Sequence, residues 1–131
     1  MNIKDFAEKF IKAEDEAWLN GNFDALEKME DSKVVYYMPP PMPDVVGFEA
    51  HKQYILGNRQ LSSGLRQEWH YLTGEGNLFA LSYKATGQFT GQVPGLPPTV
   101  GKNFINNFLF LLRLNKGKVV EVWANGNMTI K

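Results

Sequence analysis

The period of the hydrophobic pattern changes along the chain, and this change restricts the possible folds more than any other feature. In residues 3–18, apolar side chains recur every three or four positions. This predicts a long amphipathic helix that ends at the "NGN" of residues 20–22. In the second half, apolar and polar residues alternate, as in "LRQEWHYL", which is typical of strands with one buried face. Helices followed by a series of strands predict an α+β fold, a curved antiparallel sheet wrapped around the long N-terminal helix.

Shorter patterns predict the remaining elements. The stretch "FDALEKME" favours a short second helix, "SKVVYYM" a strand that ends at "PPPMP", and "FEAHKQYILGNRQL" a third helix. No linker, repeat or low-complexity segment divides the chain, so we expect residues 1–131 to form a single domain. Four further strands are expected at residues 65–72, 78–89, 103–114 and 119–125.

Composition excludes several classes of function. Lysine plus arginine equals aspartate plus glutamate at 14 each, so no net charge attracts nucleic acid or an anionic membrane. No cysteine is available for a disulfide or a thiolate zinc site, and the two histidines lack partners at metal-ligand spacing, so we expect no metal or cofactor. The longest apolar run, residues 108–112, is too short to cross a bilayer, and the charged N-terminus has no apolar signal core. These features favour a soluble cytoplasmic protein.

Five ordered motifs resemble those of one known family. They are the glycine- and proline-rich hairpin "GQFTGQVPGLPPTVGK" of residues 87–102, "VVYYMPP", "VVGFEAHKQYI", "TGEGNLFALSY" and "NKGKVVEVWANGN". Together they resemble the SnoaL-like polyketide cyclases, which belong to the cone-shaped superfamily named after nuclear transport factor two. The resemblance implies a deep pocket for a small hydrophobic, cyclic or aromatic molecule, cofactor-free cyclase or isomerase chemistry, and a homodimer. It also implies that the hairpin forms a lip over the pocket.

The chain departs from this family at its ionisable positions. The hairpin histidine of the family falls on Phe89, its strand-end His–Asp pair on Tyr37 and Met38, and its terminal aspartate on Asn127. All aspartates lie within the first 44 residues, and the strands expected to line a pocket offer few carboxylates. A general base therefore looks scarce. The alternative to an enzyme is a ligand-binding or dimerisation module that has lost the family's acid and base groups.

Four residues are the catalytic candidates on this basis. Tyr37 and Asn127 would polarise a carbonyl group, and His70, oriented by Glu68, would be the base. Plain packing is the favoured alternative for Tyr37, and for His70 with Glu68 the favoured alternative is that they are solvated neighbours on the outer side of the sheet. His51, on the apolar side of the third helix, is more typical of a hydrogen-bonded core or rim histidine.

Aromatic and amide side chains are the ligand-binding candidates. Asn103, Asn106 and Asn107 interrupt an apolar strand, and buried amides need partners, which a ligand, a β-bulge or a hydrated interface could supply. An enzyme should hold at least one buried ionisable group with a strongly shifted pKa in its cavity, whereas a binding module need not. The ligand-binding candidates are Trp18, Met38, Phe89, Asn107, Trp123 and Asn125.

Overall fold

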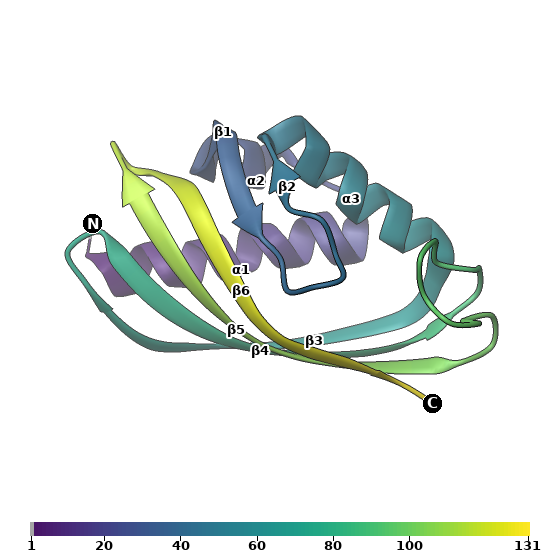
Figure 1. Cartoon of the computed structure of the whole chain (residues 1–131). Helices are drawn as coiled ribbons and strands as arrows, with labels where there is room; N and C mark the ends of the chain where they lie inside the picture. Colours follow the sequence, from purple (N-terminus) through teal and green to yellow (C-terminus); the bar gives the residue numbers. More distant parts are fainter. Residues whose placement is uncertain (1) are drawn as a thin grey trace.

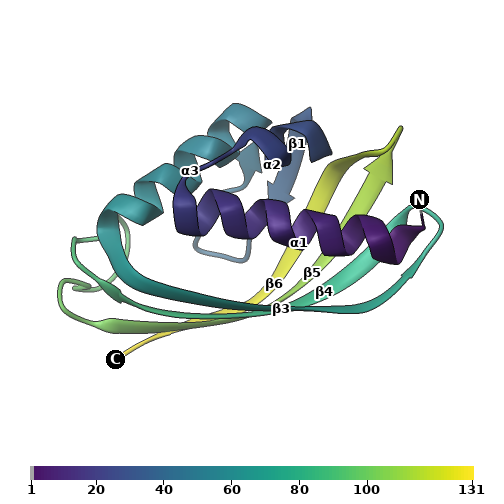
Figure 2. The ribbon, with the colours of Figure 1, turned by 180° about the vertical axis from the view of Figure 1, so that it is seen from behind.

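Helix α1 (Ile3–Asn20) lies across the concave face of a strongly curved sheet (Figures 1 and 2). The computed structural model describes residues 2–131. The helix begins where the side chain of Asn2 accepts a hydrogen bond from the Asp5 amide. It ends at Gly21, whose left-handed conformation (φ 70°) allows its amide to bond back to Ala17. The predicted helix and its end point are therefore confirmed.

The sheet has six strands in the order β2-β1-β6-β5-β4-β3. Strands β3 to β6 form the antiparallel meander that the alternating pattern predicts, whereas β1 pairs with β6 in parallel. The two-residue strand β2 beside β1 was not expected, because so short a segment carries no pattern. The bounds are β1 (Glu30–Tyr37), β2 (Val45–Val46), β3 (Ser62–Glu75), β4 (Leu78–Phe89), β5 (Asn103–Asn115) and β6 (Lys118–Ile130).

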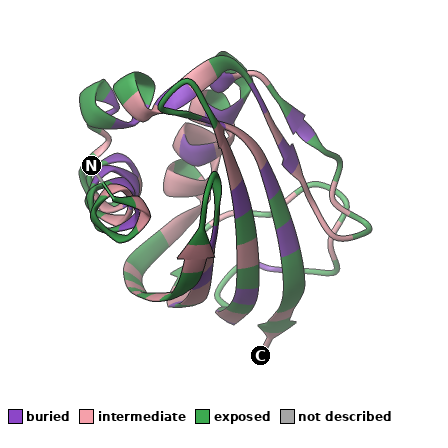
Figure 3. Ribbon diagram, turned by 90° about the vertical axis from the view of Figure 1, so that its left-hand side faces the viewer, coloured by how far each residue is buried: buried purple, intermediate pink, exposed green. Residues whose placement is uncertain are grey.

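Burial alternates along the long strands and fixes which face looks into the fold (Figure 3). On β3, Gln67, Trp69 and Tyr71 face inward and are partly buried, whereas Glu68 and His70 are exposed. Helix α2 (Asp24–Met29) and helix α3 (Phe48–Leu61) complete the cover above β1. The core joins the inner face of α1 to the inner faces of β1, β4, β5 and β6. The curved sheet and the helices thus enclose a space between them.

The hairpin between β4 and β5 packs on the end of α3. The amide of Thr90 donates to the carbonyl of Leu61 at 2.8 Å. Gly91 comes so close that a Cβ there would lie 2.6 Å from the Leu61 side chain. Thr99 is fully buried, and its hydroxyl bonds to Gly91 O and Val93 N across the hairpin. None of the helices within residues 2–131 is both long and apolar enough to cross a membrane.

Candidate active site

An apolar cavity lies between α1, β1 and α3 on one side and the inner faces of β3 to β6 on the other. The centres of water-sized molecules can occupy about 90 Å³ of it. The cavity is partly open, so a small cyclic ligand can enter it and extend beyond its mouth. Its walls are mainly aromatic and aliphatic. They comprise Phe10, Glu14, Trp18, Tyr36, Met38, Met42, Val45, His51, Tyr54, Trp69, Leu81, Tyr83, Asn106, Phe108, Phe110, Leu112, Val122 and Met128.

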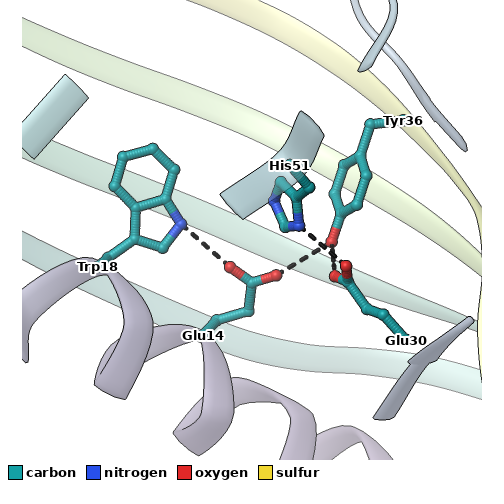
Figure 4. A network of polar contacts seen from close by, with 5 residues as sticks. All are labelled: Glu14, Trp18, Glu30, Tyr36 and His51. Carbon is teal, nitrogen blue, oxygen red and sulfur yellow. Dashed lines mark hydrogen bonds and ion pairs between the residues drawn. The ribbon is translucent and has the colours of Figure 1, made fainter. Parts of the chain in front are cut away.

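Glu14 places a carboxyl group in this apolar wall. It lies one turn after Phe10 and one turn before Trp18, so all three share the inner side of α1. The residue is only 3% exposed. The indole N–H of Trp18 donates to Glu14 Oε2 at 3.0 Å, which fixes the orientation of the carboxyl group (Figure 4). A carboxyl group on the buried side of a helix therefore faces the ligand space.

Glu30 and His51 form a second buried pair behind this wall. Glu30 is the first residue of β1 and is 1% exposed, and His51 lies on the inner side of α3 with Phe48 and Ile55. His51 Nδ1 lies 2.9 Å from Glu30 Oε1, and its Nε2 is turned away from Glu30 (Figure 4). The imidazole stacks on Tyr36 with ring centroids 4.0 Å apart. The pair thus fixes the plane of a histidine that lines the cavity.

The hydroxyl of Tyr36 joins the two carboxyl groups. Its oxygen lies 3.0 Å from Glu14 Oε1 and 2.5 Å from Glu30 Oε2 (Figure 4). A phenol has one proton, so it can donate to only one of these oxygens. If Tyr36 donates to Glu30 along the shorter contact, a protonated Glu14 can donate to the phenol oxygen. The geometry therefore fits a chain in which Glu14 holds a proton and Glu30 is ionised.

Electrostatics support the same assignment of protons. Burial raises the pKa of Glu14 to about 7; the charge of Glu30 acts in the same direction, and His51 opposes it. Burial alone would lower the pKa of His51, but the charge of Glu30 and the hydrogen bond to it, together with Glu14, raise it overall. Burial, followed by the two nearby carboxyl groups, raises the pKa of Tyr36 well above its usual range. Near neutral pH, Glu14 can gain or lose a proton, while His51 tends to keep its own.

The same cluster has the composition of a cation site. Glu14, Glu30 and His51 each offer one ligand atom, and these atoms lie within 4.8 Å of one another. The expectation that both histidines lack partners is therefore wrong for His51. A cation here would have to displace the Tyr36 hydroxyl from between the two carboxyl groups. We assign the cluster as a hydrogen-bonded acid and base network, because its internal partners already satisfy the potential ligand atoms.

The four sequence-based catalytic candidates do not line this cavity. Neighbouring residues on a strand point to opposite faces, so Tyr36 faces inward and Tyr37 outward. The Tyr37 hydroxyl donates to Glu121 at 2.7 Å. This bond raises the pKa of Tyr37 and is the largest of the causes that lower the pKa of Glu121. The remaining three, Glu68, His70 and Asn127, are exposed residues of β3 and β6 on the convex face. Glu68 and His70 are therefore solvated neighbours on the outer side of the sheet, as the alternative to a catalytic role predicted.

The ligand-binding candidates divide between the two faces. Trp18 and Met38 line the cavity. Phe89 is buried against Phe104, with ring centroids 4.7 Å apart, and does not reach the cavity. The other three, Asn107, Trp123 and Asn125, are exposed residues on the convex face.

The hairpin contributes no residue to the cavity lining, so the expectation that it forms a lip over the pocket is wrong. Met38 and Met42, at the end of β1 and in the loop that follows, line the cavity together with Met128 near the end of β6. The hairpin is held against the end of α3 instead, through Leu61.

The sequence interpretation missed the buried acids. It considered acids on the strands alone, whereas the carboxyl group in the cavity lining is that of Glu14 on the helix. Glu14 comes from α1 and Glu30 from the first position of β1. One signal was available, because Glu14 interrupts the apolar side of α1 at helical spacing from Phe10 and Trp18. Nothing in the sequence shows that Glu30 and His51 meet it.

A cone-shaped α+β fold with a partly open apolar cavity defines the class of protein. The sequence pattern of the SnoaL-like polyketide cyclases matches residues 8–129, so the chain belongs to that family. None of the curated proteins matches its sequence.

Solved structures with a similar fold share little sequence with the chain. TsrD from Streptomyces laurentii has a TM-score of 0.80 at 15% identity, covering 97% of this chain and 92% of its own. A candidate SnoaL-like polyketide cyclase from Jannaschia sp. CCS1 has a TM-score of 0.78 at 19% identity, and the alignment covers 95% of this chain and 86% of the Jannaschia protein. IdmH from Streptomyces antibioticus, a candidate polyketide cyclase, has a TM-score of 0.71 at 20% identity, and the alignment covers 95% of this chain and 91% of IdmH. At these identities the likeness establishes the fold alone.

Proposed function

We propose that the protein is a cofactor-independent cyclase or isomerase that transfers a proton next to the carbonyl group of a small hydrophobic cyclic molecule. The observation that carries this proposal is the buried carboxyl group of Glu14, which faces an apolar cavity and whose pKa is raised to about 7. A general base is most effective when its pKa lies near the working pH. A buried ionisable group with a shifted pKa is also the feature that separates an enzyme from a binding module.

The proposed reaction begins with removal of a proton from the carbon beside the carbonyl group. Glu14, as a carboxylate, accepts this proton. The electron pair of the C–H bond forms the C=C bond of an enolate, and the carbonyl π electrons move to oxygen. The imidazolium of His51 keeps one N–H on Glu30 and has its Nε2–H left to donate to the enolate oxygen. Tyr36 and Trp18 hold Glu14 in place.

Two outcomes are open to such an enolate. Return of the proton from Glu14 to a different carbon completes an isomerisation. Attack of the enolate carbon on a second carbonyl carbon forms a C–C bond, and transfer of the proton from Glu14 to the new alkoxide completes an intramolecular aldol closure and restores the Glu14 carboxylate. Both reactions need only a base, an oxyanion partner and a cavity that excludes water.

Deuterium exchange tests this function without knowledge of the natural substrate. The probe is α-tetralone, a two-ring aromatic ketone, incubated with the protein in heavy water while proton NMR follows the loss of the signal beside the carbonyl. We expect faster exchange than in buffer, and a rate that rises with pH through about 7 as Glu14 ionises. Glu14→Gln should lower the catalysed rate by about 10²- to 10⁴-fold.

The matched control is Glu8→Gln, which removes a carboxyl group from the exposed side of the same helix. This variant should exchange the probe at the wild-type rate. If the wild type binds the ketone but exchanges it no faster than buffer, the proton-transfer function is refuted. The non-catalytic ligand-binding module is then the better description.

We also propose that the protein is a homodimer whose subunits meet through the convex face of the sheet. Leu109 and Leu111 on β5 and Trp123 on β6 lie on this face and are 54%, 42% and 37% exposed, and Leu72 on β3 is 52% exposed. Apolar side chains gathered on one sheet face favour burial against a partner. A second copy of the chain would present the same apolar face, as a two-fold interface requires.

A further inference from the structure

Asn106 is a polar residue in an apolar row. Along β5, the side chains on the inner face are Phe104, Asn106, Phe108, Phe110 and Leu112. Asn106 pairs in register with Ala85 on β4 and Met128 on β6, neither of which can offer its side chain a hydrogen bond. An aliphatic or aromatic residue would fit this position at lower cost in desolvation.

The side-chain oxygen of Asn106 has no hydrogen-bond partner. Among residues 2–131, it is the only buried side-chain nitrogen or oxygen atom without a hydrogen-bond partner. Other polar groups of the wall have hydrogen-bond partners, since Trp69 donates to Asp15 at 3.0 Å and Tyr83 donates to Gln67. Buried polar atoms in native proteins are almost always paired, so an unpaired oxygen in the wall of a cavity is a position where a donor group of a ligand can bind.

We infer that Asn106 is a specificity residue that accepts a hydrogen bond from a hydroxyl group of the substrate. The inference rests on the proposed function, because the carbonyl end of the same molecule would lie at Glu14 and His51. The aromatic side chains of Phe108 and Phe110, on the same strand face, supply a surface for a flat ring. The substrate class is therefore a cyclic ketone that also bears a hydroxyl group on its ring system.

The direction of this hydrogen bond makes the inference specific. An oxygen acceptor is satisfied by a hydroxyl group but not by a methyl ether or a bare ring carbon. A site built to bond a hydroxyl group rejects the analogue that lacks it, because its own polar atom is then left unpaired. A hydroxylated ligand should therefore bind about tenfold more tightly than its parent.

Calorimetric titration of the whole protein tests this inference. The probes are α-tetralone, the set of its monohydroxylated aromatic-ring isomers, and the methyl ethers of those isomers. We expect at least one hydroxylated isomer to bind the wild type about tenfold more tightly than both the parent ketone and its own methyl ether. Equal binding of the three kinds of probe overturns the inference, as does binding of none.

Two leucine variants separate recognition from structure. Asn106→Leu should bind all three kinds of probe alike and should melt at or above the wild-type temperature, because it removes an unpaired buried amide. Asn107→Leu, the matched control on the exposed face of the same strand, should keep the preference for the hydroxyl group. An Asn106→Leu protein that keeps the preference, or that melts several degrees lower while the control does not, shows that the amide has a structural role and overturns the inference.

The variant Glu14→Gln distinguishes failure of this inference from failure of the proposed function. It should lose catalysed deuterium exchange and keep the preference for the hydroxylated ketone. A wild-type protein that exchanges α-tetralone but prefers none of the hydroxylated isomers would overturn the inference and leave the proposed function standing.

Discussion

The substitution Glu14→Gln should remove a large part of the pH dependence of stability. The pKa of Glu14 is about 7 in the folded protein against an ordinary value of 4.5. At about 1.4 kcal/mol for each pH unit, this difference corresponds to about 3 kcal/mol of folding free energy. Glutamine cannot ionise, and its amide can accept from Trp18 and donate toward Tyr36 as the neutral acid does.

The sign follows from where the proton binds more tightly. Between about pH 4.5 and 7, the folded state holds the Glu14 proton and the unfolded state has lost it. The contribution of Glu14 to the free energy of unfolding is therefore largest at low pH. It falls across that window as pH rises and is constant above it. The raised pKa of His51 acts in the same direction at higher pH, since its extra stabilisation is lost as that proton leaves.

Urea unfolding near pH 5 and near pH 8 provides the measurement. The stability of Glu14→Gln relative to the wild type should increase by about 3 kcal/mol between the two conditions. Glu8→Gln, which changes an exposed carboxyl group on the same helix, should follow the wild type at both. If the free energy of unfolding changes equally with pH in the wild type and in Glu14→Gln, Glu14 does not titrate in this window. That result would refute the assignment of Glu14 as the base.

Three further predictions concern the network, the convex face and the sheet. Tyr36→Phe removes the hydroxyl between Glu14 and Glu30, so urea unfolding should show a loss of about 1–3 kcal/mol; wild-type stability would show that the two buried carboxyl groups do not need it. Leu109→Lys places a charge in the exposed apolar patch, so light scattering after gel filtration should show monomers, and circular dichroism should show wild-type helix content; an unchanged dimer would argue against the convex interface. Gly126→Ala should destabilise the protein by about 3 kcal/mol or more in thermal unfolding, since a Cβ would lie 2.0 Å from a backbone oxygen of the neighbouring strand; wild-type stability would show that β5 and β6 can separate there.

The sequence determined the secondary structure and the class of fold, because these depend on local periodicity. Apolar residues at helical spacing define the inner side of α1, and its end is set by Gly21. Alternation along β3 predicts that Trp69 and His70 lie on opposite faces. The ordered motifs along the chain also indicated the correct family, which the match over residues 8–129 confirms.

Only the tertiary structure decided which face looks into the cavity and which acids reach it. Alternation divides a strand into two faces but does not say which one the helices cover. Tyr36 and Glu14 are 22 residues apart, and His51 and Glu30 are 21 apart, so no local pattern brings them together. Burial then changes the chemistry, because removing a carboxyl group from water raises its pKa toward neutrality. Glu14 has the same covalent structure as the exposed Glu8 on the same helix, and it becomes a candidate base because folding encloses it in an apolar wall.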